Sequence, residues 1–204
     1  VDINNVTVKQ YPTELGGPKT VIEYDLKDSG MSPASPAYVF IRCSTDFGDT
    51  WQRISMDSLR GNGVGMVDKP GHKQAVWWGT NQTRFADRSQ VEIRVRGIAM
   101  ARVPAGKFIL KSLPGSGRDE SGKSKPSADL PRFYMAQHET TIAMYSDYLN
   151  EVGDEGFGWH KRMNNPDRCG IVRQNDNTYS VMPGRADYPI TYISWYDAQN
   201  FLQW

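Results

Sequence analysis

Histidine and cysteine are the residue types in this chain best suited to metal binding or nucleophilic chemistry, so their spacing is the first evidence about function. The three histidines, His72, His138 and His160, follow no metal-ligand spacing such as H-E-x-x-H. The two cysteines, Cys43 and Cys169, exclude a disulfide scaffold but allow one bridge. Because they fall in segments that we assign to different domains, we expect two free thiols. We assign no catalytic role to any of the five.

A phosphate-binding loop is a second chemistry to consider. Residues 117–124 (GRDESGKS), from Gly117 to Ser124, fit the expression G-x-x-x-x-G-K-[ST]. This loop binds phosphate when it connects a buried strand to a helix. Pro126 disfavours a helical conformation at Lys125, and the next segment has the pattern of a strand. We therefore interpret the segment as a solvated loop and keep nucleotide binding as a remote alternative.

Oxygen-bearing side chains between residues 154 and 184 could bind calcium, but they lack the spacing of an EF-hand. A solvated loop is the simpler interpretation, and the sequence leaves the metal unknown. The residues concerned are Asp154, Glu155, Asn164, Asn165, Asp167, Asn175, Asp176 and Asn177.

Four aromatic residues, Trp77, Trp78, Trp159 and Tyr179, could stack on the apolar faces of sugars. Aromatic side chains are also large contributors to protein cores, where they pack against strands and turns. The four residues are therefore candidates for ligand binding, with core packing as the alternative.

Residues 44–51 (STDFGDTW) match the Asp-box pattern of a β-hairpin. We expect Ser44 and Asp46 to bond turn amides, Gly48 to adopt a positive φ, and Trp51 to pack beneath the turn. The pattern occurs once and no repeat accompanies it, which predicts a structural hairpin rather than a glycosidase.

The composition is that of a polar globular protein, with 38% hydrophobic residues, 23% charged residues and a formal net charge of +1. This charge gives no reason to expect nucleic-acid binding. No apolar run approaches the roughly 20 residues that a membrane span needs. A chain of 204 residues is long enough for one large domain or two small ones.

Residues 1–98 have the pattern of a β-sandwich of the immunoglobulin or fibronectin type. Apolar and polar residues alternate over residues 22–26 and 91–96, and residues 38–41 are apolar on both faces. Turns rich in Gly, Pro and Asn separate these segments, and no helical period occurs. We place the domain boundary near residues 97–100 and expect a separate strand on each side of it.

Residues 99–204 contain two segments in which a short strand leads into an amphipathic helix. In residues 133–152, Thr141 is a suitable N-cap, and we expect Glu139 to bond the backbone near the helix start. In residues 188–204, a strand at 190–193 precedes Ser194 and Asp197, which are in capping-box position. The predicted buried faces comprise Ile142, Tyr145, Tyr148, Leu149 and Val152 in the first helix, and Ala198, Phe201 and Leu202 in the second.

Three motifs in this second part carry a resemblance. They are residues 103–108 (VPAGKF), residues 139–141 followed by Tyr145 and Leu149, and residues 189–204 with Ser194, Trp195 and Asp197. In this order they are similar to segments of the formylglycine-generating-enzyme (sulfatase-modifying factor) family. The resemblance covers residues 99–204 and implies an α+β domain with a fold like that of the C-type lectins.

The resemblance also implies that the chain holds only the first half of the family domain. In the family, the segment after the third motif carries calcium sites and the paired cysteines that bind copper. We therefore assign no catalytic or cofactor residue here and expect calcium or copper only in a full-length member. We expect the native protein to be longer, so that Phe201 and Trp204 lack packing partners in this chain. Family and domain pairing imply an extracytoplasmic bacterial protein.

Two functions are compatible with these observations. In the first, the family domain is non-catalytic as it stands and serves binding or assembly with a protein or glycan at the cell surface, or with its own missing half. In the second, the protein is a formylglycine-generating oxidase that acts on a sulfatase cysteine, with its catalytic half outside this chain. We expect no nucleic-acid partner and no membrane span.

Overall fold

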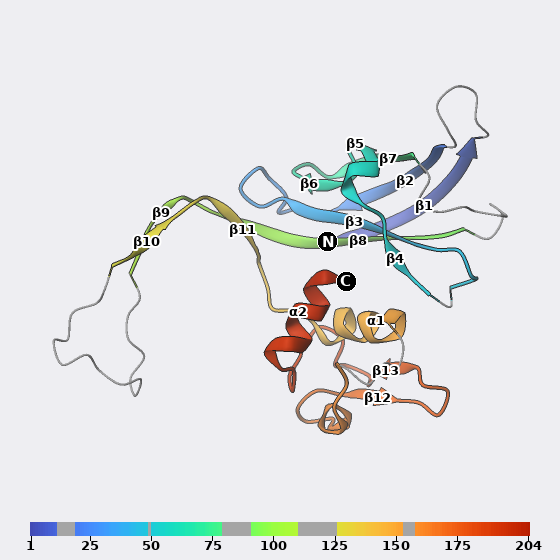
Figure 1. The fold of residues 1–204 in the computed structure, drawn as a ribbon, viewed down its shortest axis with the longest axis vertical. Coiled ribbons are helices and arrows are strands. Elements are labelled where there is room, and N and C mark those ends of the chain that lie inside the picture. The colour runs from blue at the N-terminus through green and yellow to red at the C-terminus, as the bar shows by residue number, and fades with distance from the viewer. Residues whose placement is uncertain (12–18, 49, 79–90, 110–125, 153–157) are drawn as a thin grey trace.

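The computed structural model describes residues 1–11, 19–48, 50–78, 91–109, 126–152 and 158–204. A layer of β-strands lies on one side of the molecule, two helices lie beneath it, and a two-stranded arm projects away (Figure 1). The β-rich fold class is confirmed for these residues. The likeness of the second part to C-type lectins stays a prediction.

The first sheet is antiparallel and has the strand order β1-β2-β7-β5. Alternation along its second strand decides which side chains are buried, because successive residues point to opposite faces. Ile22, Tyr24 and Leu26 are fully buried, whereas Glu23 and Asp25 are partly exposed. The strands are β1 (Asp2–Tyr11), β2 (Lys19–Lys27), β5 (Leu59–Gly61) and β7 (Gly71–Trp78).

The second sheet has the strand order β11-β8-β3-β4, and β6 also pairs with β3. Its central strand β3 is buried along almost its whole length, as the apolar run at residues 38–41 predicts. The strands are β3 (Ala37–Ser44), β4 (Gln52–Arg53), β6 (Gly65–Val67), β8 (Glu92–Val103) and β11 (Phe133–Ala136).

The two sheets share one hydrophobic core. Side chains from β2, β3, β7 and β8 meet in it, with Ile41 fully buried and Trp77 only 5% exposed. The hydroxyl of Tyr24 donates to the carbonyl oxygen of Gly63 at 2.6 Å, so its polar end is satisfied inside the core. A short 3₁₀ helix, η1 (Met56–Ser58), precedes β5. Whether the topology is of the immunoglobulin type stays a prediction.

Strand β8 runs without interruption across the position where we placed a domain boundary. Residues 92–99 pair with β3, and residues 100–103 pair with β11. On the β3 side, the amides of Met100 and Arg102 continue the bonding to the carbonyl oxygens of Pro36 and Ala34. The expectation of two separate strands around residues 97–100 is therefore wrong. The strand continues because its backbone groups find hydrogen-bond partners along its whole length, in β3 first and then in β11.

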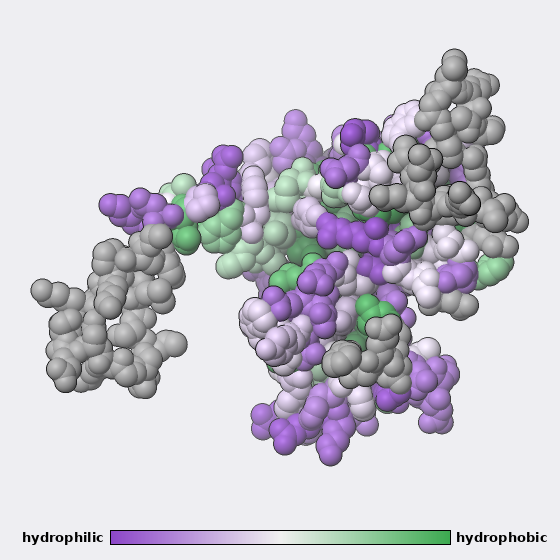
Figure 2. All heavy atoms as spheres, viewed as in Figure 1, coloured by the Kyte–Doolittle hydropathy of each residue, from purple (hydrophilic) through white to green (hydrophobic). Residues whose placement is uncertain are grey.

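The arm continues from β8 and β11. Strands β9 (Gly106–Ile109) and β10 (Pro126–Leu130) pair antiparallel and extend away from the body (Figure 1). At the base of the arm, Phe133, Tyr134 and Met135 are 39%, 38% and 53% exposed. Figure 2 shows hydrophobic residues gathered in this region. The predicted strand at the start of residues 133–152 is confirmed as β11.

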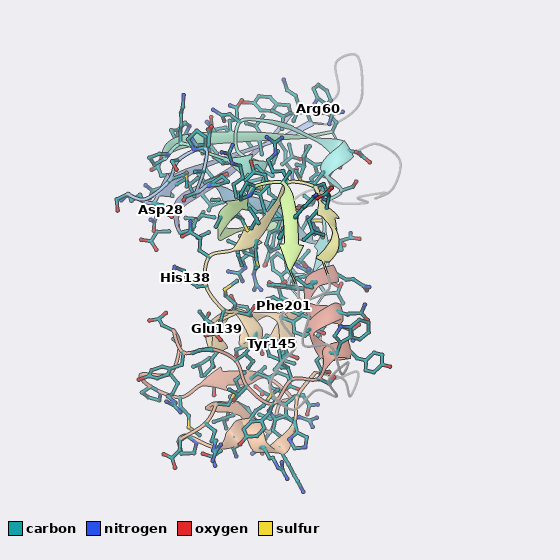
Figure 3. The ribbon with its side chains drawn as sticks, turned by 90° about the vertical axis from the view of Figure 1, so that its left-hand side faces the viewer. Asp28, Arg60, His138, Glu139, Tyr145 and Phe201 are labelled. Carbon is teal, nitrogen blue, oxygen red and sulfur yellow. The ribbon has the colours of Figure 1, made fainter. Side chains whose placement is uncertain are left out.

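The helices form a second core below the sheets. It contains side chains from α1 (Ile142–Val152), α2 (Trp195–Gln203), η3 (Lys161–Asn164), β12 (Ile171–Arg173) and β13 (Tyr179–Val181). Figure 3 shows Tyr145 of α1 beside Phe201 of α2, and their ring centroids are 5.7 Å apart. Thr141 begins α1 as predicted, because its hydroxyl accepts the amide hydrogen of Met144 at 3.2 Å.

Two expectations for the region around α2 are wrong. Residues 190–193 form no strand: Pro189 makes an isolated bridge with Thr141, and Tyr192 then adopts φ 64°, which interrupts an extended chain. Leu202 is 76% exposed rather than buried. The helix packs through Phe201, which is 8% exposed, and the side of α2 that carries Leu202 faces away from the core.

Phe201 and Trp204 do have packing partners, contrary to our expectation. Phe201 packs against Tyr145, Tyr148 and Trp204, with ring centroids 5.5 to 5.7 Å apart. The Trp204 ring packs edge-on against Phe40 of β3, at 5.9 Å. The strand layer supplies contacts that we had expected to be missing.

No helix in the described part of the chain has the length and apolar character needed to cross a membrane.

Candidate functional site

An open pocket of about 370 Å³ lies where the polypeptide enters α2, and we call it the α2 pocket. Segments from the start of η3 and from the turn before α2 meet there. Its lining combines aromatic rings with hydrogen-bonding groups and consists of Gly158, Trp159, His160, Tyr192, Ile193, Ser194 and Asp197.

Ser194 and Asp197 are held in the pocket by the capping box that begins α2. The Ser194 hydroxyl accepts the amide hydrogen of Asp197 at 3.2 Å, and Asp197 Oδ2 accepts the amide hydrogen of Ser194 at 2.7 Å. The predicted capping box is thus confirmed. The Ser194 hydroxyl hydrogen and Asp197 Oδ1 make no hydrogen bond with any described residue, so a ligand can use both.

His160 is fixed by the backbone of η3. Its Nδ1 accepts the amide hydrogen of Arg162 at 3.2 Å, so His160 is the N-cap of this 3₁₀ helix. In neutral histidine this bond places the proton on Nε2. His160 therefore offers the pocket a hydrogen-bond donor in addition to its ring.

Tyr192 has a strained backbone. Its φ of 64° lies in the left-handed region, which glycine or asparagine adopts more easily than tyrosine. Such strain costs about 1 to 3 kcal/mol and occurs frequently at functional sites. The Tyr192 ring lies 6.5 Å from that of His160, and the two rings form one wall of the pocket.

Trp159 also lines the pocket. Its indole Nε1 is buried and makes no hydrogen bond to the described part of the chain. Because protein atoms enclose this nitrogen, it is not a donor that a ligand in the pocket can reach. Aromatic walls with a few donors and acceptors are typical of binding sites for small polar ligands.

Only one of the four predicted aromatic ligand residues lines this pocket. Trp77 is buried between the sheets, whereas Trp78, its neighbour on β7, is 37% exposed and has the Lys19 amine 6.0 Å from its ring. Trp159 and Tyr179 belong to the second core, with ring centroids 6.3 Å apart. The four residues therefore do not form one site, because Trp77 and Trp78 lie in the first sheet.

Sequence reasoning missed His160 and Tyr192 as pocket residues. The sequence offers His160 as a possible metal ligand and predicts a strand that contains Tyr192, and neither pattern indicates a pocket. The left-handed backbone of Tyr192 and the nearness of the two rings arise from the turn before α2, for which the sequence carries no simple signal.

The Asp-box hairpin has the hydrogen bonds that its pattern requires. The Ser44 hydroxyl accepts the Gly48 amide hydrogen at 2.8 Å, and Asp46 Oδ1 accepts the Thr50 amide hydrogen at 2.9 Å. Gly48 has φ 87°, and the indole of Trp51 donates to the Gly48 carbonyl oxygen at 3.0 Å. These side chains are occupied with the turn itself.

Two residues of the family motifs are exposed. Glu139 is exposed on the segment between β11 and α1, where Figure 3 labels it beside His138. It makes no hydrogen bond to a described residue, so the structure gives no support for its predicted bond to the backbone. Trp195 is 67% exposed and contacts the neighbouring ring of Tyr196 at 5.3 Å.

The two cysteines lie in different cores. Cys43 and Cys169 are free and buried, the first between the sheets and the second among the helices. Burial raises the pKa of the Cys43 thiol to about 11, which disfavours the reactive thiolate. The two thiols cannot act as a redox pair in this arrangement.

The remaining candidates for cofactor binding do not form a site in the described residues. Residues 117–124 lie outside them, as do Asp154 and Glu155. Asp176 Oδ1 accepts two hydrogen bonds from Thr178, and Asn165 Oδ1 accepts the Asp167 amide hydrogen, so these oxygens stabilise local turns. The described residues contain no group of three His, Cys, Asp or Glu able to hold a metal.

Comparison with known proteins identifies a family. Residues 85–204 match the family model described as the sulfatase-modifying factor enzyme 1-like domain. The matched segment begins before β8 and therefore includes a central strand of the second sheet. No curated protein and no solved structure matches the chain.

Proposed function

Because this chain belongs to the sulfatase-modifying factor enzyme 1-like domain family, we propose that it is an extracytoplasmic bacterial binding or assembly protein of that family. Its partner is a protein or a glycan at the cell surface, and the α2 pocket is the binding site. The observation that carries this proposal is the pocket itself, where aromatic rings surround hydrogen-bonding groups that the described residues leave available.

The chemistry of the pocket favours a neutral polyhydroxylated ring, as in a glycan. The rings of Tyr192 and His160 can pack on an apolar sugar face. The Ser194 hydroxyl and His160 Nε2 can donate, and Asp197 Oδ1 can accept, so the donors and acceptors of sugar hydroxyls find complementary groups.

The surroundings of the cysteines support binding rather than catalysis by this chain. In the family that the sequence resembles, formylglycine formation needs two neighbouring cysteines. Cys43 and Cys169 lie in separate cores and cannot form such a pair. We propose that residues 99–204 have a C-type-lectin-like fold, that residues 1–98 form an immunoglobulin-like sandwich, and that the first domain presents the second.

Replacement of Tyr192 by asparagine tests the pocket, because asparagine tolerates the left-handed backbone and removes the ring. We expect the unfolding free energy of Tyr192→Asn to stay within about 1 kcal/mol of the wild-type value, since relieved strain offsets lost packing. Saturation-transfer NMR with glucose, galactose and N-acetylglucosamine should show signal transfer from the wild-type protein and a several-fold loss in the variant.

The control is Tyr11→Asn, which removes an exposed tyrosine ring from β1, distant in sequence from the pocket, and should leave sugar binding unchanged. If none of the three sugars receives signal from the wild-type protein, binding of these sugars at the α2 pocket is wrong. Equal transfer in wild type and Tyr192→Asn would place the sugar elsewhere.

The second candidate function is formylglycine-generating oxidation of a sulfatase cysteine, which the family match favours. It is tested with the full-length protein and a sulfatase-derived cysteine peptide, by mass spectrometry of the peptide. Conversion of the cysteine to formylglycine would establish this activity and would contradict the non-catalytic proposal.

A further inference from the structure

A buried carboxylate joins the helices to the strand layer. The side chain of Glu151, near the end of α1, is 0% exposed, and three arginines of the second sheet surround it. Its Oε1 accepts hydrogen bonds from Arg94 Nη1 at 2.7 Å and from Arg96 Nη2 at 3.4 Å. Its Oε2 lies 2.6 Å from Arg42 Nε, so the two groups form an ion pair. The geometry at Arg42 Nε is not that of a hydrogen bond. We call these four residues the charge cluster.

Arg42 connects three parts of the chain. Its side chain is 4% exposed, and its two terminal nitrogens donate to the carbonyl oxygens of Trp51 at 2.6 Å and Trp204 at 2.7 Å. Burial lowers the pKa of the Arg42 guanidinium, and the charge of Glu151 acts in the opposite direction. Arg42 of β3 thus contacts the Asp-box hairpin, α1 and the end of α2.

Trp204 completes the contact from the side of α2. Its indole Nε1 donates to Glu151 Oε2 at 2.9 Å, and its ring lies 4.9 Å from the Arg42 guanidinium carbon. The carboxylate therefore has charged or polar partners from both the sheet and the second helix.

Loss of the Glu151 carboxylate would weaken the contact between the helices and the second sheet more than it weakens either part alone. A buried ion pair adds little net stability compared with apolar packing, but removal of one partner leaves the others charged and unpaired in a buried place. Without Glu151, the cluster keeps the ion pair of Arg96 with Asp147, at 3.0 Å, but Asp147 is 48% exposed and lies at the edge of the contact. The guanidinium of Arg42, whose side chain is 4% exposed, would gain hydration only if the helices moved away from the sheet.

We infer that the charge cluster makes the strand layer and the helices one cooperative unit, with the helices held in a fixed orientation, rather than two modules joined by a linker. Strand β8 also runs without interruption through residues 92–103, so the expected boundary at residues 97–100 lies within a strand and not in a linker. The inference does not depend on any ligand of the α2 pocket.

The two cysteines allow a direct test, because each reports on one core. The full chain is incubated over a urea gradient with N-ethylmaleimide, and labelling of Cys43 and Cys169 is measured separately by mass spectrometry of their peptides. In the wild type we expect both thiols to become reactive at the same urea midpoint. In Glu151→Gln we expect the urea midpoint of Cys169 to lie below that of Cys43. At urea concentrations between these two midpoints, Cys169 should be labelled at least ten times faster than Cys43.

The matched control is Glu23→Gln, which removes the partly exposed partner of Lys9 on the first sheet. It should leave the two midpoints coincident, since such surface pairs contribute little. Separate midpoints in the wild type, or coincident midpoints in Glu151→Gln, would overturn the inference. If Glu151→Gln does not fold, Arg94→Met replaces it. Arg94 is 40% exposed, so its loss weakens the cluster only in part and the variant should fold. Its Cys169 midpoint should again lie below its Cys43 midpoint, and coincident midpoints would overturn the inference.

Discussion

At the scale of single residues, Asp46 shows how an exposed carboxylate stabilises a turn. Hydrogen bonds from the Thr50 hydroxyl and amide, together with the Ser44 hydroxyl, lower the pKa of Asp46 to about 2. The folded protein therefore binds the proton of this group less readily than the unfolded chain does.

This difference predicts a pH-dependent stability. Because the folded pKa is depressed, the contribution of Asp46 is fully present above the ordinary aspartate pKa of 3.8 and is lost as the pH falls toward 2. We expect the melting temperature of the wild type to fall more steeply than that of Asp46→Asn between these values. Thermal unfolding followed by circular dichroism in a pH series measures this, and parallel curves for the two proteins would contradict it.

Tyr192 and Glu151 belong to the same scale but act differently. Tyr192 has an unfavourable backbone that its surroundings impose, whereas Glu151 has a buried charge that its partners satisfy. In each case a residue that would be costly by itself is retained by contacts from another part of the chain.

At the scale of elements, α2 shows that a helix can bury a narrower face than its sequence suggests. Phe201 packs among three aromatic rings, whereas Leu202, the next residue, points outward. The capping box fixes where the helix begins, and hence which residue faces α1.

Adjacent alanine substitutions test this orientation. Phe201→Ala should lower the unfolding free energy by about 3 kcal/mol or more, because it leaves a cavity in the second core. Leu202→Ala, the matched control on the same helix, should change it by less than about 0.5 kcal/mol. Urea unfolding followed by tryptophan fluorescence measures both values. Equal losses would show that Leu202 is buried in solution.

At the scale of the whole molecule, the two hydrophobic cores share no residue, but ion pairs join the elements that enclose them. The first lies between the sheets and the second around α1 and α2, and the charge cluster with Trp204 lies where the sheet meets the helices. The buried Arg42 of β3 and the buried Glu151 of α1 are paired only when both parts are present.

Thiol reactivity provides a prediction at this scale. In the native protein, Cys43 and Cys169 should react with Ellman's reagent at least about 100-fold more slowly than after unfolding in guanidinium chloride, because each is buried in a core. Free cysteine measured under the same conditions is the reference. Rapid reaction of either thiol in the native protein would show that its core opens readily.

Local patterns in the sequence were sufficient for much of the secondary structure. The alternation at Ile22, Tyr24 and Leu26, the Asp-box turn, the Thr141 cap and the Ser194 capping box depend on residues close together in the chain. Such short-range rules act wherever the segment is placed, so the sequence alone predicts them. The three ordered motifs also indicated the family to which the chain belongs.

The tertiary structure alone decided which distant groups meet. Arg42 and Glu151 are buried because β3 and α1 lie against each other, and no sequence spacing encodes that contact. The α2 pocket arises where the His160 cap meets the strained turn at Tyr192. These features depend on long-range packing, which sets the partners of a buried charge and the backbone that a residue must adopt.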